Sequence, residues 1–386
     1  AARRLLPHLS CSLLFSAFRT SEGPMKHSLQ RSRFRRLALC LVCLCTAVGV
    51  LVCVLPLLGS MHDAPSDTAL DVPNDAECVR FIHPSVVRTW RQSDYLVALG
   101  VPSPDTDRRR RRFLLRETSW TYKGVATKRN NFSGDMLVLY LLARHPMHGY
   151  EYSAELVQEA AEWQDVITLP MREGQVTTKK TVGSNGYWGF PAEVGMSRKS
   201  FMWFDLALRL LPSVKYISKG DDDAFHHAPQ FIADLRVLPR RGVYWGHRFY
   251  EANARIDFMR GLLYTLSRDV AYKYVSYKPV RRLVYAPFTA GSRSVYEAHF
   301  LHHEDVMSAL IVNWTKDNSL LYVSEHCCRY TVLNTGECSM PRKDNFVVVH
   351  GVGEADYAEL MDRLKGYVLP VPARFVPTPG GLRAEC

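Results

Sequence analysis

The hydrophobic and polar positions of residues 113–386 alternate between strand-length apolar runs and helical periods. Four apolar runs have the length of strands, namely residues 135–144, 165–170, 214–218 and 242–249. Three segments between them have the apolar spacing of helices, namely residues 153–164, 198–212 and 229–238. Strands that alternate with helices predict a mainly parallel sheet with helices on both faces. The pattern therefore predicts an α/β, Rossmann-like domain, in which ligands collect at the carboxyl ends of the strands.

A second kind of segment precedes this domain. Residues 37–59, LALCLVCLCTAVGVLVCVLPLLG, carry no charge, and as a helix these 23 residues would be about 35 Å long, enough to cross a bilayer. A cleaved signal peptide has a shorter apolar region and a small-residue cleavage site, which is not evident here. Arginines precede the segment and aspartates follow it, so residues 1–36 are expected in the cytosol and everything after residue 59 in the lumen. We expect a single-pass type II membrane protein held by a transmembrane signal anchor.

The segments before and after the predicted anchor can be divided further. Met25 lies just before the basic cluster, so residues 1–24 are either part of the cytosolic tail or untranslated upstream sequence. Residues 60–112 are interpreted as a luminal stem, with a catalytic domain at 113–386. The five arginines at 108–112 are interpreted as a solvated linker, although the middle of the stem is apolar enough to pack on the domain.

Cysteines and sequons fit a luminal location. Five cysteines lie after the anchor, namely Cys78, Cys327, Cys328, Cys338 and Cys386. An oxidising lumen favours disulfides, and an odd number leaves at least one cysteine free or intermolecular. Two N-glycosylation sequons begin at Asn131 and Asn313 and support the same topology.

Charge excludes one class of partner. The net charge is +11, and residues 1–112 carry 16 Lys and Arg against 9 Asp and Glu, whereas residues 113–386 carry 33 against 29. A protein that binds nucleic acid concentrates its positive charge on the domain that does the binding. Most of the excess lies outside the predicted domain, so we expect no nucleic-acid partner.

Three adjacent aspartates, Asp221, Asp222 and Asp223, follow the predicted strand 214–218. Adjacent carboxylates repel one another, but a divalent cation such as Mn²⁺ or Mg²⁺ would neutralise them, and carboxylate oxygens suit such an ion. The alternative is an acidic loop or a helix N-cap, because a helix that begins with proline follows. The position at a strand end favours a site for a metal and a diphosphate.

Five sequence blocks resemble one family. They are LLRETSW (114–120), EAAEWQDVITLP with TTKKT (159–181), KGDDDAF (219–225), GLLYTLSRDV (261–270) and HEDVMSALI (303–311). They occur in the order of the β-1,3-glycosyltransferase family, which includes galactosyltransferases and Fringe-like enzymes, and look most like the kinetoplastid phosphoglycan β-1,3-galactosyltransferases. An extra residue separates Arg116 from Trp120, Leu262 replaces a glycine, and Ala309 stands where the family often has glycine. These departures leave acceptor specificity open.

The resemblance implies a GT-A fold and an inverting transfer in the Golgi. A sugar, most simply galactose, would move from a UDP-sugar to the 3-hydroxyl of a glycan acceptor similar to a phosphoglycan. It further implies that Asp223, Asp221 and His350 bind Mn²⁺ or another divalent cation, with Asp221, Asp222 and Arg116 close to the nucleotide. A lone histidine at a strand end is otherwise more often a structural residue.

The resemblance also implies the catalytic base. An inverting transfer needs a carboxylate that takes the proton of the acceptor hydroxyl. Asp305 is assigned this role, and Glu304 is assigned to orient it or to bind the acceptor. Without the resemblance, both residues would be interpreted as acidic residues that stabilise a helix N-terminus.

Other functions remain open at this point. A membrane-anchored homologue that binds sugar without turnover would need no base at Asp305. A transferase that uses UDP-GlcNAc or UDP-GalNAc would share every block. A metal-dependent phosphohydrolase or nucleotidyl-type transferase could use the aspartates, but it would need more metal ligands than the sequence offers and leaves the Glu304–Asp305 block unexplained.

Overall fold

The computed structural model describes residues 75–181, 186–315, 319–333, 338–341, 343–365 and 370–386. All of these described residues belong to one compact unit. The predicted membrane anchor at 37–59 lies outside the described residues. Within them, no helix has both the length and the apolar character needed to cross a membrane.

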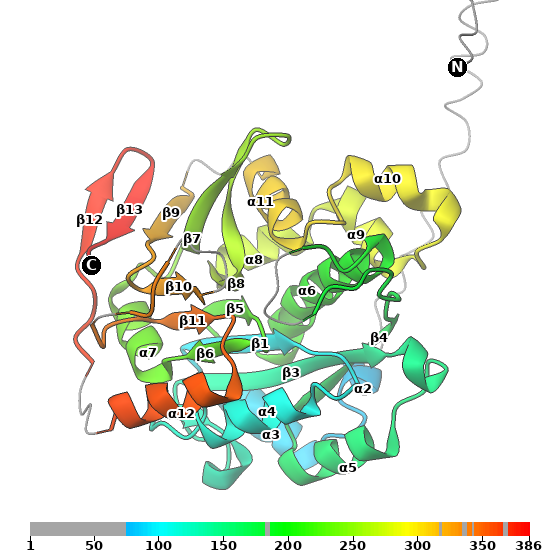
Figure 1. Ribbon diagram of the computed structural model, residues 1–386, viewed down its shortest axis with the longest axis horizontal. Helices are drawn as coiled ribbons and strands as arrows, with labels where there is room; N and C mark the ends of the chain where they lie inside the picture. Colours follow the sequence, from blue (N-terminus) through cyan, green and yellow to red (C-terminus); the bar gives the residue numbers. More distant parts are fainter. Residues whose placement is uncertain (1–74, 182–185, 316–318, 334–337, 342, 366–369) are drawn as a thin grey trace, which may run out of the picture. The chain divides into compact units, whose positions relative to one another are not determined.

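A ten-stranded mixed sheet forms the centre of the domain (Figure 1). Neighbouring strands lie in the order β12 (Phe375–Thr378), β13 (Gly381–Ala384), β9 (Leu321–Glu325), β7 (Val243–Glu251), β8 (Ile256–Ser267), β5 (Tyr216–Gly220), β1 (Val97–Pro102), β3 (Met136–Arg144) and β2 (Val125–Ala126), and β4 (Val166–Arg172) also pairs with β3. Most pairings are parallel, but β8 runs antiparallel to both β5 and β7, and β12 runs antiparallel to β13. The predicted mixed, mainly parallel α/β fold is confirmed.

Helices cover both faces of this sheet, and Figure 1 shows α6 on one side of β1 and α4 and α12 on the other. One hydrophobic cluster holds residues of α3 (Pro84–Gln92), α6 (Phe190–Leu210), α8 (Arg268–Val275), α9 (Lys278–Tyr285), α10 (Arg293–Ala298) and α11 (Glu304–Trp314). The other holds residues of α4 (Arg109–Glu117), α5 (Ala154–Trp163), α7 (Ala228–Val237) and α12 (Glu354–Arg363). Short helices complete the fold, namely α2 (Asp75–Cys78), η1 (Lys128–Asn130), η2 (Pro146–His148) and η3 (Ala290–Ser292).

The predicted stem differs from the structure. Strand β1, at Val97–Pro102, pairs with β3 on one side and β5 on the other, so it lies inside the sheet. The domain therefore includes residues from Asp75 onward, and the predicted boundary at residue 113 was wrong. The arginine run is not a solvated linker either, because it opens α4 and the Arg112 side chain is 1% exposed.

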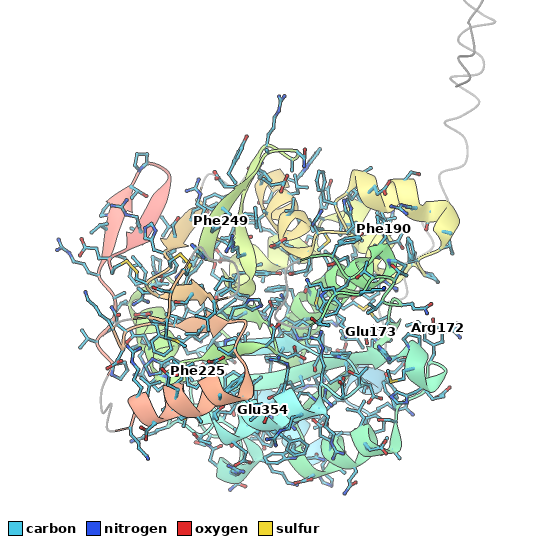
Figure 2. The ribbon with its side chains drawn as sticks, viewed as in Figure 1. Arg172, Glu173, Phe190, Phe225, Phe249 and Glu354 are labelled. Atoms are coloured by element: carbon cyan, nitrogen blue, oxygen red, sulfur yellow. A yellow bond between two sulfur atoms is a disulfide. The ribbon has the colours of Figure 1, made fainter. Side chains whose placement is uncertain are left out.

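A second, three-stranded sheet brings distant segments together. It consists of β10 (Tyr330–Val332), β11 (Val348–His350) and β6 (Ala224–His226). Strand β11 runs antiparallel to β6, and His350 pairs with Ala224. Phe225, which Figure 2 labels, packs against Tyr357 of α12, and their ring centroids are 6.0 Å apart. The pairing places His350 next to the residue that follows Asp223.

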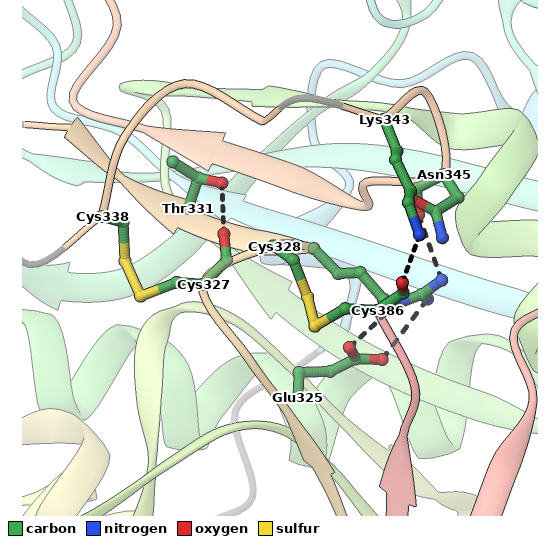
Figure 3. The surroundings of a disulfide bond; sticks show 9 residues. Glu325, Cys327, Cys328, Thr331, Cys338, Lys343, Asn345 and Cys386 are labelled. Atoms are coloured by element: carbon green, nitrogen blue, oxygen red, sulfur yellow. Dashed lines mark hydrogen bonds and ion pairs between the residues drawn. A yellow bond between two sulfur atoms is a disulfide. The ribbon is translucent and has the colours of Figure 1, made fainter.

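Two disulfides clamp the segment that leads into this small sheet. Cys327 pairs with Cys338, and Cys328 pairs with Cys386 (Figure 3). Cys78 is buried and carries a free thiol. The expectation that some of the five cysteines pair and at least one does not is confirmed, and the adjacent cysteines have separate partners.

Candidate active site

The three predicted metal ligands lie together at the carboxyl end of β5. Asp221 and Asp223 follow the last residue of the strand, and His350 approaches from β11. One ligand atom each from these three residues lies within 4.8 Å of the others. The His350 Nε2 atom is 3.0 Å from Asp223 Oδ1 and 3.4 Å from Asp221 Oδ2. The β6–β11 pairing thus joins residues that are far apart in the sequence.

Neighbouring positive charges keep the two carboxylates of this trio ionised. Burial alone would raise the pKa of Asp221, but Lys219 and His350 hold it well below its usual range. Burial also opposes ionisation of Asp223, and His350 again outweighs it and lowers the pKa. Burial disfavours the imidazolium of His350, yet Asp223 and Asp221 raise its pKa to about 10. That pKa keeps the ring protonated at neutral pH, so a divalent cation such as Mn²⁺ would displace the proton and then have two carboxylates and an imidazole as its donors.

Asp222, the middle aspartate, points away from the trio. Its Oδ2 accepts a hydrogen bond of 2.7 Å from Ser103 Oγ, and its Oδ1 accepts one of 3.1 Å from Arg108. The side chain is 3% exposed, and burial raises its pKa although Arg108 opposes the shift. Asp222 therefore anchors the aspartate loop to the segment after β1, and both of its carboxylate oxygens are occupied by these contacts.

A second acidic pair lies at the start of α11. Glu304 is 7% exposed, its Oε1 accepts a hydrogen bond of 2.6 Å from the Tyr264 hydroxyl, and its Oε2 is 3.3 Å from Lys219 Nζ. Asp305 remains partly exposed, and its Oδ1 accepts a hydrogen bond of 2.9 Å from the Val306 N–H. Burial, with the Glu304 charge beside it, raises the pKa of Asp305 to about 7. Asp305 is therefore the carboxylate that can take a proton near neutral pH.

Lys219, which the sequence analysis did not single out, lies between the two clusters. It is 2% exposed on β5, and its Nζ is 2.6 Å from Asp221 Oδ1 and 3.3 Å from Glu304 Oε2. The signal was present in the sequence, because Lys219 interrupts a buried strand two residues before the first site aspartate. A lysine in such a position is buried only when it is paired.

Arg116 lies in a different environment from the one predicted. Its Nε and Nη2 atoms donate to Asp165 at 2.9 and 2.7 Å, and its Nη1 donates to Glu159 at 2.8 Å. The guanidinium also lies over the rings of Tyr140 and Trp163, at 4.6 and 4.9 Å from their centroids. The side chain is 3% exposed. The geometry gives Arg116 a packing role and does not support the predicted nucleotide contact.

Comparisons with known proteins point to one class of enzyme. No family model matches the chain. The chain is 24% identical over 203 residues to lactosylceramide 1,3-N-acetyl-beta-D-glucosaminyltransferase B of Xenopus laevis, a match that covers 47% of the chain and 48% of the relative. It is 24% identical over 226 residues to the lactosylceramide 1,3-N-acetyl-beta-D-glucosaminyltransferase of Xenopus tropicalis, covering 53% and 54%. The chain spans about half the length of these curated relatives. The similarity supports a β-1,3-glycosyltransferase, and the mixed α/β fold fits the GT-A architecture.

Proposed function

We propose that the protein is an inverting β-1,3-glycosyltransferase that moves a sugar from a UDP-sugar to the 3-hydroxyl of a glycan. The observation that carries this proposal is the pairing of two sites around Lys219. The trio of Asp221, Asp223 and His350 suits a metal that binds a diphosphate, and Asp305 suits a base that activates a hydroxyl. A protein that only binds sugar would need the first site but not the second.

Two kinds of donor sugar have support, galactose and an N-acetylhexosamine. The sequence resemblance favours UDP-galactose and an acceptor similar to a phosphoglycan. The names of the Xenopus relatives favour UDP-GlcNAc instead, and UDP-GalNAc belongs to the same alternative. We keep galactose as the first donor because the sequence blocks resemble galactosyltransferases most.

The residues divide the chemistry as follows. Asp221, Asp223 and His350 would hold the cation, which when bound would neutralise the diphosphate as it departs. Asp305 would accept the proton of the acceptor hydroxyl, and a pKa of about 7 suits a base at neutral pH. Glu304 would keep that pKa raised through its own charge, while its hydrogen bonds hold it in place.

The location is part of the proposal. Residues 37–59 would anchor the protein in the Golgi membrane, with residues 1–36 in the cytosol and the described domain in the lumen. The two disulfides are consistent with an oxidising compartment. Protease treatment of intact vesicles should spare the domain, and its digestion without detergent would contradict this topology.

A donor screen on the full chain in detergent tests the activity. UDP release and glycan product are measured with Mn²⁺ for UDP-galactose, UDP-GlcNAc and UDP-GalNAc. Asp223→Asn removes one charge at constant size, so transfer should collapse while the fold survives. Asp94→Asn is the matched control, because the Asp94 side chain is 70% exposed and its ion pair with Lys215 lies on the surface. Full turnover in EDTA, or UDP binding without turnover by any donor, would contradict the proposal.

A further inference from the structure

The Lys219 ammonium contacts both halves of the proposed active site. Its Nζ atom donates hydrogen bonds to Asp221 Oδ1 at 2.6 Å and to the Gly261 carbonyl at 2.7 Å, and it forms an ion pair with Glu304 Oε2 at 3.3 Å. The side chain lies on β5, the Gly261 carbonyl lies on β8, and Glu304 lies on α11. Lys219 therefore connects three elements at one point.

Lys219 contacts one oxygen each of Asp221 and Glu304, so the other oxygen of each carboxylate can contact a different group. Asp221 gives Oδ1 to Lys219, and its Oδ2 faces His350 at 3.4 Å. Glu304 gives Oε2 to Lys219, and its Oε1 accepts the hydrogen bond from Tyr264. Lys219 thereby fixes which oxygen of Asp221 is directed at the metal trio. Its ion pair with Glu304 also holds the carboxylate of the residue before Asp305 in position.

Stability alone does not account for this arrangement. A buried ion pair is often no more stabilising than apolar residues of similar volume, and the preceding residues of β5 include the buried Tyr216 and Ile217. The space for Lys219 also depends on Gly261. A Cβ atom at Gly261 would lie 3.1 Å from Lys219 Nζ and 3.1 Å from Glu304 Oε2. A buried charge that needs a glycine beside it is better explained by the site than by the fold.

We propose that Lys219 is a positioning residue that couples the donor half of the active site to the acceptor half. It holds Asp221 in the orientation of the metal trio and Glu304 in contact with Asp305, so that the metal and the base keep a fixed separation. The inference rests on the proposed transferase activity, because a protein that binds only a nucleotide needs no such separation. It does not require Lys219 to touch either substrate.

The groups that face Asp305 give the inference a measurable signature. The negative charge of Glu304 on α11 disfavours the ionised form of Asp305, whereas the Lys219 ammonium on β5 favours it. The charge of Asp305 in turn raises the pKa of the Tyr244 hydroxyl on β7. The N–H groups of Gly261 and Val306 also favour the carboxylate. Loss of the Lys219 charge should therefore raise the pKa of Asp305, and loss of the Glu304 charge should lower it.

The experiment compares Lys219→Met with Glu304→Gln in the full chain, using Mn²⁺ and the donor found active with the wild type. We expect Lys219→Met to lower kcat by about a hundredfold, the scale for catalytic groups that are displaced by about 1 Å. Calorimetric binding of UDP with Mn²⁺ should weaken severalfold, because Asp221 loses the ammonium that orients it, but it should remain measurable because Asp223 and His350 are unchanged. The acid limb of the pH–rate profile should move by about one unit, upward in Lys219→Met and downward in Glu304→Gln.

Lys199→Met is the matched control for the loss of a buried lysine. Lys199 is 1% exposed and pairs with Glu173, so its replacement should leave the acid limb in place. An acid limb that stays in place in a folded Lys219→Met variant would overturn the inference. If Lys219→Met does not fold, an acid limb that stays in place in Glu304→Gln would overturn it instead. A parallel loss of UDP–Mn²⁺ binding and transfer would make Lys219 part of the metal site alone. A wild type that transfers no sugar would refute the proposed function itself.

Discussion

Asp305→Asn should make the protein more stable at alkaline pH while it abolishes most of the activity. The pKa of Asp305 is raised from 3.8 to about 7 by burial and by Glu304. Below pH 3.8 the folded and unfolded chains both hold the proton, so the group contributes nothing. Between pH 3.8 and 7 the unfolded chain ionises first, so the free energy of unfolding falls as the pH rises. Above pH 7 the whole penalty is present.

The size of the effect follows from the shift in pKa. A shift of about 3 units corresponds to about 4 kcal/mol, which is an upper bound for a carboxylate that is still partly exposed. Solvent screening reduces the expected gain to about 1–2 kcal/mol. Asparagine does not ionise, and its Oδ1 can still accept the hydrogen bond from the Val306 N–H. The variant should therefore gain stability over the wild type at pH 8 but not at pH 4.

Urea unfolding of both proteins across this pH range measures the gain, and transfer assays measure the cost. Transfer should fall about a hundredfold while UDP and Mn²⁺ still bind, because the metal trio is separate from Asp305. A carboxylate that only stabilises the N-terminus of α11 would give the opposite sign, since its loss at pH 8 would cost a few tenths of a kcal/mol. Equal stability of the two proteins at pH 8, or a less stable variant, would refute the assignment of a raised pKa.

Three further substitutions test the disulfide that supports β11, the contact between Lys219 and Glu304, and the ion pairs of Arg116. Cys328→Ser opens the clamp before β10, so it should weaken Mn²⁺ binding and lower stability by about 2–4 kcal/mol, and unchanged Mn²⁺ affinity would contradict this. Gly261→Ala places a methyl group against Lys219 and Glu304, so transfer should fall about tenfold to a hundredfold with UDP binding retained, and normal transfer would argue against a close-packed pair. Arg116→Met leaves Asp165 without its ion-pair partner while Glu159 keeps Arg112, so it should destabilise the fold by about 1–3 kcal/mol. A folded Arg116→Met protein that loses UDP affinity would restore the nucleotide contact.

Much of the fold could be predicted from periodicity, and the main failure has a physical cause. All seven strands and helices predicted between residues 135 and 249 are present, with shifted ends. Strand β1 was missed because it is a short run, VALGVP, that contains Gly100 and ends at Pro102, so it was interpreted as an apolar part of the stem. It also lies close to five arginines, and side chains such as Arg112 are buried only because Glu159 pairs with them. That pairing is tertiary and leaves no local trace in the sequence.

The site was predictable in its residue types more than in its geometry. Carboxylates after a strand indicated a cation, and the structure brings Asp221, Asp223 and His350 within reach of one ion. The direction of each carboxylate was not predictable, because Asp222 is turned away by Ser103 and Arg108 after β1. Local sequence gives a residue its neighbours along the chain, whereas the direction of its side chain depends on what packs against it.

The trio of Asp221, Asp223 and His350 depends on the pairing of β11, in the C-terminal part of the domain, with β6. His350 reaches Asp223 because β11 pairs with β6, and the start of β11 is held in turn by the Arg329 carbonyl, which accepts hydrogen bonds of 2.8 Å from the Val347 N–H and 3.1 Å from the Val348 N–H. The residue before Arg329 is one of the disulfide cysteines, so the clamp and the metal ligand are linked through a few residues. A reducing compartment would remove the clamp and loosen the strand that carries the ligand. This dependence favours an oxidising lumen for the active protein, which is where the anchor proposed at residues 37–59 would place the domain.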